Sequence, residues 1–349
     1  MPTILRHDRC VLRAPRSWEE LTPAWLTEAL SRSFPGAVVK EAYVGGVAHG
    51  TNDRAHVRLT YAAGAGPERV FVKREGSLLN RLALTALGAR EAEADLALAD
   101  AELPLERPTF YAAAVDRRRL AAVTVMEDVT LRDARPHSAI TPLTLDQVAS
   151  GLRGLARLHA TYRERPLPAF VRPWRLPRAW APVSGASLAN ARRRLRALGH
   201  ADLLPDTVAA IDRGFRAWPA VAAAGPQTLL HGDPHPGNTY ALPDGTTGFY
   251  DWQLVRSGSW VHDVGYFVVS GLSVADRRVH ERDLLALYLA ERGGDEPDAW
   301  DLYRRTPVFG LGSWLHTLSG GGFQPVDVCL ATIERFAAAY ADHASRSRT

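Results

Sequence analysis

The chain has 349 residues, of which 46% are hydrophobic and 23% charged, and it carries a formal net charge of +4. Its arginines are scattered and form no basic stripe interleaved with aromatic residues, which argues against a nucleic-acid partner. Cys10 and Cys329 are too few and too far apart to indicate a disulfide framework or a zinc site. Because no apolar run reaches membrane-span length and the first ten residues lack a signal-peptide pattern, we expect a cytoplasmic protein without a membrane partner.

The first elements expected along the chain are two strands joined by a glycine-bearing turn. The glycine-bearing segment 43–52 is followed by residues 56–61, in which apolar and polar side chains alternate. Glycine lets the backbone approach phosphates closely and present N–H groups to them. The sequence therefore predicts a phosphate-binding turn, with an ordinary hairpin as the alternative. The candidate phosphate-contacting residues of this turn are Gly45, Gly46, Gly50 and Thr51.

The next strand, residues 69–73, ends in one of the two lysines of the chain; the other is Lys40. In a composition this rich in arginine, the lysine at position 73 indicates that a compact ammonium is needed, as for a point charge on a phosphate. A helix is predicted over residues 89–99 from its strong helix formers. Glu91 is the candidate partner of Lys73, with Glu93 in reserve; either could instead be a solvated surface residue.

A buried strand is predicted at residues 120–129, ending in an acidic pair. Such a strand end can offer backbone groups to an adenine or guanine edge, and the candidate residues are Glu127 and Val129. The helical pattern that follows places the lobe boundary here, with a nucleotide-binding lobe at 1–128 and a helical lobe at 129–349. His159, on the first helix of that lobe, is predicted to be a core histidine. Helices are expected at 147–163, 188–198, 207–218, 264–272, 279–291, 300–318 and 328–343.

The most informative motif is His231-Gly232-Asp233-Pro234-His235-Pro236-Gly237-Asn238, followed by Asp251. A short strand at 227–230 leads into it, and its two prolines prevent continued strand pairing or helix. A hairpin over 240–249 would return Asp251 to the side of Asn238. Asp233 suits the role of a base that orients a hydroxyl, while Asn238 and Asp251 suit Mg²⁺ held against nucleotide phosphates. The spacing therefore predicts kinase chemistry.

Two other interpretations of the same residues stay open. His231, Asp233 and His235 stand at alternate positions and could form a metal-hydrolase site on a regular strand, although the intervening prolines disfavour that strand. The Asp-Pro and Pro-Gly-Asn steps are also ordinary turn chemistry.

The helical lobe is expected to form the acceptor site. Acidic and basic residues alternate over 276–283, so no acidic cluster for a polycationic acceptor is evident and a neutral, partly apolar hydroxyl compound is favoured. The candidate pocket residues, which could equally be aromatic core, are Trp260, Tyr303, Trp314 and His316.

The order of motifs along the chain resembles the aminoglycoside phosphotransferase and choline kinase superfamily; these motifs are the glycine turn, VFVK, REAEADLAL, VTVMED, HGDPHPGN and YDW. The segments 18–26 and 251–267 resemble the ecdysteroid-kinase-like branch of that superfamily. The resemblance implies a two-lobed α+β protein-kinase-like fold, ATP or GTP as donor, Mg²⁺, and phosphorylation of a small-molecule hydroxyl such as that of an antibiotic, sterol or glycoside. It implies that Asp233 is catalytic and that Asn238 and Asp251 bind the metal. It further implies that Lys73 binds phosphate with Glu91 as its ion-pair partner, and that His231 and Asp263 support the loop.

This chain departs from the family pattern at Pro234, after the catalytic Asp, and in lacking a strict GxGxxG. Three classes therefore remain: a small-molecule kinase, a nucleotide-binding pseudokinase and a metallohydrolase using His231, Asp233 and His235. The oligomeric state is not predicted.

Overall fold

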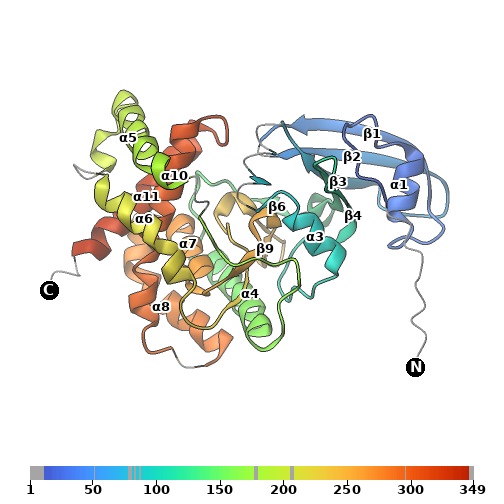
Figure 1. Cartoon of the computed structure of the whole chain (residues 1–349). Helices are drawn as coiled ribbons and strands as arrows, with labels where there is room; N and C mark the ends of the chain where they lie inside the picture. Colours follow the sequence, from blue (N-terminus) through green and yellow to red (C-terminus); the bar gives the residue numbers. More distant parts are fainter. Residues whose placement is uncertain are drawn as a thin grey trace, which may run out of the picture. The chain divides into compact units, whose positions relative to one another are not determined.

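The computed structural model describes residues 12–50, 52–77, 81, 84–85, 88–176, 180–204, 208–294 and 296–345. Within it the chain divides into two compact units (Figure 1). Unit 1 comprises Met1–Leu82, Ala94–Asp100 and Thr109–Asp128, and unit 2 comprises Ala83–Glu93, Ala101–Pro108 and Val129–Thr349.

Unit 1 is built on an antiparallel sheet with the strand order β1-β2-β3-β5-β4. Helix α1 begins after Thr22, whose side chain accepts a hydrogen bond from the Trp25 N–H, and Pro23 occupies its first turn without losing a helical hydrogen bond. The elements of this unit are α1 (Pro23–Leu30), β1 (Val38–Ala48), β2 (Asn52–Ala63), β3 (Arg69–Glu75), α3 (Ala92–Ala99) from Ala94 onward, β4 (Phe110–Asp116) and β5 (Ala121–Glu127).

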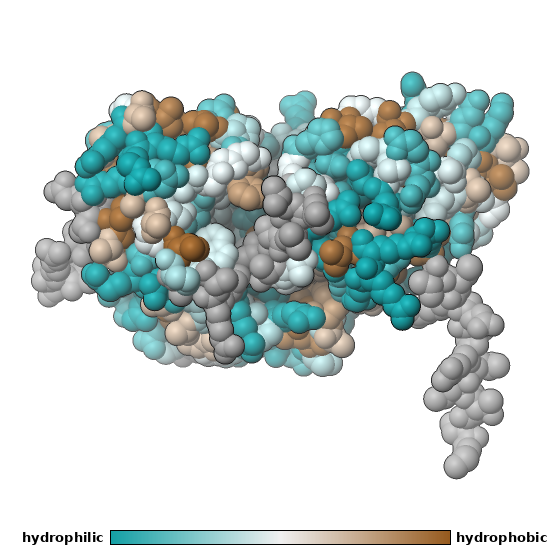
Figure 2. Space-filling model, turned by 45° about the horizontal axis from the view of Figure 1, so that its top comes forward, coloured by the Kyte–Doolittle hydropathy of each residue, from teal (hydrophilic) through white to brown (hydrophobic). Residues whose placement is uncertain are grey.

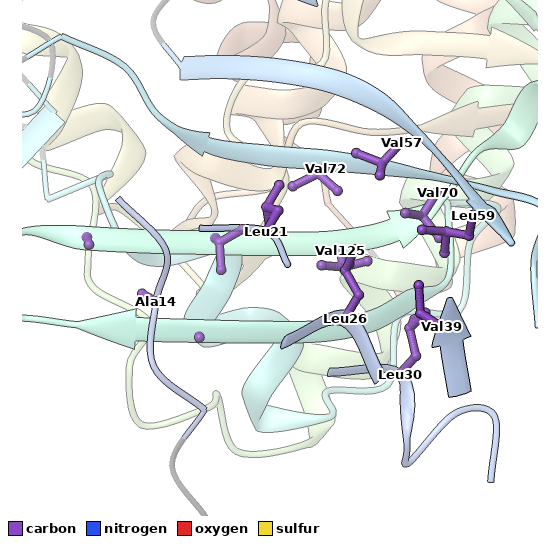
Figure 3. Packing of buried hydrophobic residues seen from close by; sticks show 13 residues of the cluster. Ala14, Leu21, Leu26, Leu30, Val39, Val57, Leu59, Val70, Val72 and Val125 are labelled. Atoms are coloured by element: carbon purple, nitrogen blue, oxygen red, sulfur yellow. The ribbon is translucent and has the colours of Figure 1, made fainter. Parts of the chain in front are cut away.

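One face of this sheet forms the core of unit 1 against α1 (Figure 3). Strand β2 alternates between buried and exposed side chains, so that Val57 and Leu59 point into the core, where Leu26 and Leu30 of α1 meet them. Each buried aliphatic side chain of this size contributes roughly 1.5–3 kcal/mol of hydrophobic stabilisation. The period-two pattern thus determines which face of the sheet is covered.

Unit 2 is mainly helical, and helix α7 lies at its centre, since every residue of α7 is buried. Helix α4 packs against it, and Gly151 permits their close approach because an added Cβ would lie 2.5 Å from the ring of Phe267. The helices of this unit are α4 (Leu145–Glu164), α5 (Ala181–Ala197), α6 (Ala209–Ala222), α7 (Val261–Gly271), α8 (Val274–Arg292), α9 (Ala299–Tyr303), α10 (Thr306–Gly320) and α11 (Val326–Ser345).

Short strands and 3-10 turns occupy the segment that holds the predicted motif. Strand β7 (Thr228–Leu230) pairs with β10 (Arg256–Gly258), while β8 (Thr239–Ala241) pairs with both β6 (Arg135–Pro136) and β9 (Thr247–Phe249). The single-turn 3-10 helices are η1 (Val129–Arg132), η3 (Ala201–Leu203), η4 (Pro236–Asn238) and η5 (Trp252–Leu254).

Four predicted helices need correction. The helix expected at 188–198 begins already at Ala181, and the one expected at 279–291 begins at Val274. The helix expected at 300–318 is two helices, α9 and α10, because Pro307 has no N–H to continue the ladder and α10 begins anew beside it. The helix expected at 89–99 begins only at Ala92. Elsewhere the predicted apolar spacing is confirmed, as in α4, where Thr144 and Gln147 also form a reciprocal N-terminal cap.

The exposed large hydrophobic side chains, such as Val183 and Val279, are dispersed along the chain. Figure 2 shows hydrophobic residues in small groups among hydrophilic ones on the face drawn. Among the described residues, no helix is long and apolar enough to cross a bilayer. The cytoplasmic location stays a prediction.

Candidate active site

The motif forms a loop anchored by a buried carboxylate. Asp263, on α7, accepts hydrogen bonds from the backbone N–H groups of His231 (2.7 Å) and Gly232 (2.9 Å). Nε2 of His159, on α4, lies 3.2 Å from the same carboxylate, and its Nδ1 lies 2.8 Å from the Tyr288 hydroxyl. Burial alone would raise the pKa of Asp263, but the hydrogen bond from His159 and nearby imidazoles hold it below the ordinary value. His159 is thus a core histidine, as predicted, and it braces Asp263.

Gly232 permits the sharp turn that starts this loop. Its φ is +88°, and an added Cβ would lie 2.0 Å from the carbonyl oxygen of Leu254. Only glycine adopts this conformation without strain while another backbone passes so close. The loop is therefore locked between Asp263 on one side and the chain at Leu254 on the other.

The geometry of His231 argues against the metal-hydrolase alternative. Its Nε2 lies 3.1 Å from the Tyr250 carbonyl oxygen, and its Nδ1 accepts the Asp233 N–H at 3.3 Å. Burial lowers the pKa of His231, which favours the neutral ring that this pattern requires. Nδ1 of His235 likewise accepts the Gly237 N–H at 3.1 Å. Within the described parts of the chain, no three His, Cys, Asp or Glu side chains gather to hold a metal ion.

Asp233 and Asn238 are brought together as the spacing predicts. The Asn238 Nδ2 donates to the carbonyl oxygen of Asp233 at 2.9 Å and to its Oδ2 at 3.3 Å. This orientation leaves the amide oxygen of Asn238 pointing away from Asp233. Asp233 therefore has its backbone fixed by the motif itself and its carboxylate only partly engaged.

The hairpin predicted over 240–249 is confirmed by the pairing of β8 with β9. Just beyond it, the Tyr250 N–H donates to the Asn238 carbonyl oxygen at 3.1 Å, which returns the chain to the motif. Asp251 follows, half-buried and at φ +65°, a conformation that Asp adopts more readily than most residues. Asn238 and Asp251 consequently belong to neighbouring strand ends.

Glu93, the reserve candidate, contributes to this region in a way that the sequence did not indicate. Its Oε1 accepts the Trp252 N–H at 2.8 Å and so fixes the backbone next to Asp251. Glu91 instead forms an ion pair with Arg90. Lys73 is 6% exposed on β3, in unit 1. Pairing of Lys73 with Glu91 stays a prediction.

The glycine turn is shorter than predicted. Strand β1 continues through Gly45 and Gly46 to Ala48, with an irregularity in its pairing after Gly45 and a φ of +59° at Gly46. The prediction of these two glycines as turn residues is therefore wrong, because an irregular strand accommodates them. Gly50 lies at the turn, and Thr51 lies outside the described residues.

At the end of β5, the Glu127 N–H donates to the Thr109 carbonyl oxygen at 2.8 Å, and its side chain accepts the Thr109 N–H. The Glu127 N–H is therefore engaged within the sheet and is not available to a nucleotide base in this arrangement. Val129 begins the 3-10 turn η1, in unit 2.

The four aromatic candidates for the acceptor pocket are buried in different surroundings. Trp260 stacks on Tyr288, and Tyr303 stacks on Trp300. Trp314 contacts the motif through the edge of the His235 ring, at 5.3 Å between centroids. His316 lies between Ser184 and Ser187, and burial lowers its pKa to about 4. Of the four, Trp314 is thus the one whose ring contact reaches the motif.

Sequence reasoning missed two residues close to Asp233. Burial raises the pKa of Tyr266 well above 10, and the negative charge of Asp233 adds to this effect. Arg256, on β10, also feels the charge of Asp233. Tyr266 stands three residues after Asp263 and therefore shares its helix face, which is the signal that the sequence offered for Tyr266. The sequence offered no such signal for Arg256.

Comparison with solved structures confirms the fold class. The chain is similar to the choline kinase LicA from Streptococcus pneumoniae, at 13% identity and a TM-score of 0.51 over 92% of this chain and 98% of that chain. It is also similar to a microcompartment-associated aminopropanol kinase, at 16% identity and a TM-score of 0.51 over 93% and 97%. A variant aminoglycoside 2′-phosphotransferase-IIIa in complex with GDP matches at 13% identity and a TM-score of 0.51 over 93% and 99%. A search of curated protein sequences found no match.

The fold is thus the two-lobed, protein-kinase-like α+β fold that the sequence predicts. The model of the phosphotransferase enzyme family, APH, matches residues 50–304. The chain belongs to this family and is a phosphotransferase. Its place in the ecdysteroid-kinase-like branch stays a prediction.

Proposed function

We propose that the protein is a small-molecule kinase that transfers the γ-phosphate of ATP or GTP to a hydroxyl group, with Asp233 as the catalytic base. The observation that carries the proposal is the pair of hydrogen bonds from Asn238 to Asp233, on a loop whose backbone is anchored by Asp263. Phosphoryl transfer depends mainly on positioning and on electrostatic stabilisation. A rigid carboxylate beside a metal-binding amide meets both needs.

Asp233 accepts the proton of the acceptor hydroxyl and directs its oxygen toward the γ-phosphorus. One carboxylate oxygen is held by Asn238 at 3.3 Å, which fixes the rotation of the side chain. The backbone of Asp233 is held from both sides, since its N–H donates to His231 and its carbonyl accepts from Asn238. A base fixed in this way loses little conformational entropy when the acceptor binds.

Asn238 and Asp251 would hold Mg²⁺. An amide oxygen and a carboxylate are ligands that suit this ion, and the Asn238 amide is oriented by its NH₂ group so that its oxygen accepts no hydrogen bond within the described part of the chain. When bound, Mg²⁺ neutralises charge on the donor phosphates. Glu93 supports the site by fixing the backbone after Asp251.

The donor site is proposed to use Lys73, with Glu91 as its partner, and the backbone of the β1–β2 segment at Gly45, Gly46, Gly50 and Thr51. The Glu127 carbonyl and the Val129 N–H are proposed to contact the base. Structures of LicA with AMP and of the aminoglycoside phosphotransferase with GDP support a nucleotide donor.

The acceptor is proposed to be a hydroxyl-bearing natural product. The similar proteins include kinases of choline and aminopropanol and a phosphotransferase of aminoglycosides, all of which are small molecules with hydroxyl groups. Trp314, next to His235, is the aromatic residue proposed to contact the acceptor.

The proposal is tested with a panel of hydroxyl compounds, each incubated with ATP or GTP and Mg²⁺ and analysed by mass spectrometry for a phosphorylated product. Asp233→Asn keeps the size of the side chain but removes the proton acceptor, so we expect kcat to fall on the order of 10²–10⁴-fold with little change in nucleotide affinity. Asp244→Asn, at the exposed hairpin turn, is the matched control and should keep full activity.

Nucleotide binding without any product would instead identify a pseudokinase. Near wild-type kcat in Asp233→Asn, with the chemical step shown to be rate-limiting, would refute the role of this loop.

A further inference from the structure

We propose that Arg256 sets the acceptor specificity of the site by favouring a substrate with an anionic or neutral, oxygen-rich group beside its reacting hydroxyl over a cationic one. This inference rests on the proposed kinase function. It begins from the position of Arg256 in the fold. In the pairing of β10 with β7, Arg256 lies opposite Leu230, the residue that leads directly into the motif.

A second connection joins Arg256 to the motif through Leu254. The Arg256 Nε donates to the Leu254 carbonyl oxygen at 2.8 Å. The same carbonyl closely approaches Gly232, where an added Cβ would lie 2.0 Å from it. One carbonyl group therefore separates the guanidinium from the residue that precedes Asp233.

The guanidinium is held in place but keeps donors for a ligand. Its central carbon lies 5.6 Å from the centroid of the Trp174 ring, which is 6% exposed, and Nε is bound to Leu254. Within the described part of the chain, no hydrogen bond and no ion pair engages Nη1 or Nη2. A fixed guanidinium with two available NH₂ groups is well suited to bind carboxylate or hydroxyl oxygens.

Arg256 and Asp233 interact electrostatically. Burial lowers the pKa of Arg256 to about 10, and the negative charges of Asp233 and Asp263 oppose this shift, so the side chain is a cation at neutral pH. A substrate hydroxyl placed on Asp233 therefore has a positive charge nearby. A cationic substituent next to that hydroxyl would be repelled, and an oxygen-rich substituent would be attracted.

The position of Arg256 favours a role with the acceptor over one with the donor phosphates. Asn238 and Asp251, the proposed metal ligands, adjoin the β6–β8–β9 sheet, whereas Arg256 and the loop at Trp174 belong with β7 and β10. A group that acts on the transferred phosphate would affect all acceptors equally. A group that contacts the acceptor would change the ratio between them.

The test compares glycerate, glycerol and choline, three small alcohols that carry a negative, no and a positive charge. Phosphorylated product is measured by mass spectrometry with ATP and with GTP, and kcat/KM is obtained for each alcohol. We expect the wild-type protein to prefer glycerate to choline by about tenfold or more. Arg256→Glu should lower this ratio by about tenfold or more, and Arg256→Lys, which keeps the charge, should largely preserve the preference.

Arg193→Gln, at an exposed position on α5, is the control for loss of one positive charge and should leave the ratio unchanged. Thermal unfolding of each variant checks the fold, and Arg256→Gln replaces Arg256→Glu if the latter does not fold. A wild-type preference for choline, or an equal fall in kcat/KM for all three alcohols in the Arg256 variants, would overturn the inference while leaving the kinase function intact. Absence of product from all three alcohols, when another compound of the hydroxyl panel is phosphorylated, would also overturn the inference; absence of product from the whole panel with both nucleotides would overturn the proposed function itself.

Discussion

Replacing Asp263 by Asn should destabilise the protein and disorganise the active-site loop. The carboxylate accepts the backbone N–H groups of His231 and Gly232 through different oxygens, and His159 contacts it at 3.2 Å. Asn has a single oxygen, so one of the two backbone N–H groups would face an NH₂ group. That group cannot accept a hydrogen bond.

The size of the effect follows from these contacts. A hydrogen bond to a charged group contributes about 1.5–3 kcal/mol, and a buried donor left without a partner costs about 1–3 kcal/mol. The smaller cost of burying a neutral side chain partly offsets these losses. We therefore expect Asp263→Asn to lower the free energy of unfolding by about 3–5 kcal/mol, which corresponds to a fall in Tm of about 4–7 °C for a chain of 349 residues.

The assay is thermal unfolding at pH 7, followed by circular dichroism, together with kcat below the transition. kcat should fall although the protein is folded, because Asp233 lies directly after the two anchored residues. Asp244→Asn is the matched control: its Oδ1 accepts the Thr246 N–H at 2.8 Å, which an Asn oxygen can also do, so its Tm should not change. A Tm of Asp263→Asn within about 2 °C of wild type would refute the anchoring argument.

Two further predictions concern Lys73 and His316. Lys73→Arg should lower kcat/KM by about tenfold or more, because a planar guanidinium replaces a compact ammonium at a buried position. The same change at the exposed Lys40 is the control and should have no effect on kcat/KM. Equal kcat/KM values in the two variants would show that Lys73 is not part of the site. The folded protein holds the pKa of His316 at about 4, so the unfolded chain takes up a proton at this residue first as pH falls below 6.5. Stability should therefore be fully present above pH 6.5 and decline toward pH 4, by roughly 3 kcal/mol from this residue. Urea midpoints between pH 4 and 7 should decline less steeply in His316→Gln, and an unchanged slope would contradict this assignment.

The amino-acid sequence by itself determined the local geometry of the motif. The prolines at 234 and 236 prevent the chain from resuming a strand after β7, and Pro236 begins the 3-10 turn η4. The turn at 243–245 closes the hairpin that leads back to Asn238. These are effects of φ restriction and turn chemistry over a few residues, so a pattern of residue types is enough to predict them. The apolar spacing of α4 was readable for the same reason.

The tertiary structure alone decided how that motif is supported. Three long-range contacts provide this support: His159 with Asp263, Glu93 with the Trp252 N–H, and Arg256 paired with Leu230 across two strands. The paired residues stand 26 to 159 positions apart in the sequence. No local preference specifies them, because they arise only when α4, α7 and β10 pack around the loop. The same holds for Gly46, which could not be assigned to a turn or a strand until the register of β1 with β2 was fixed. Short-range sterics thus fixed the shape of the catalytic loop, and long-range packing fixed its charges and hydrogen-bond partners.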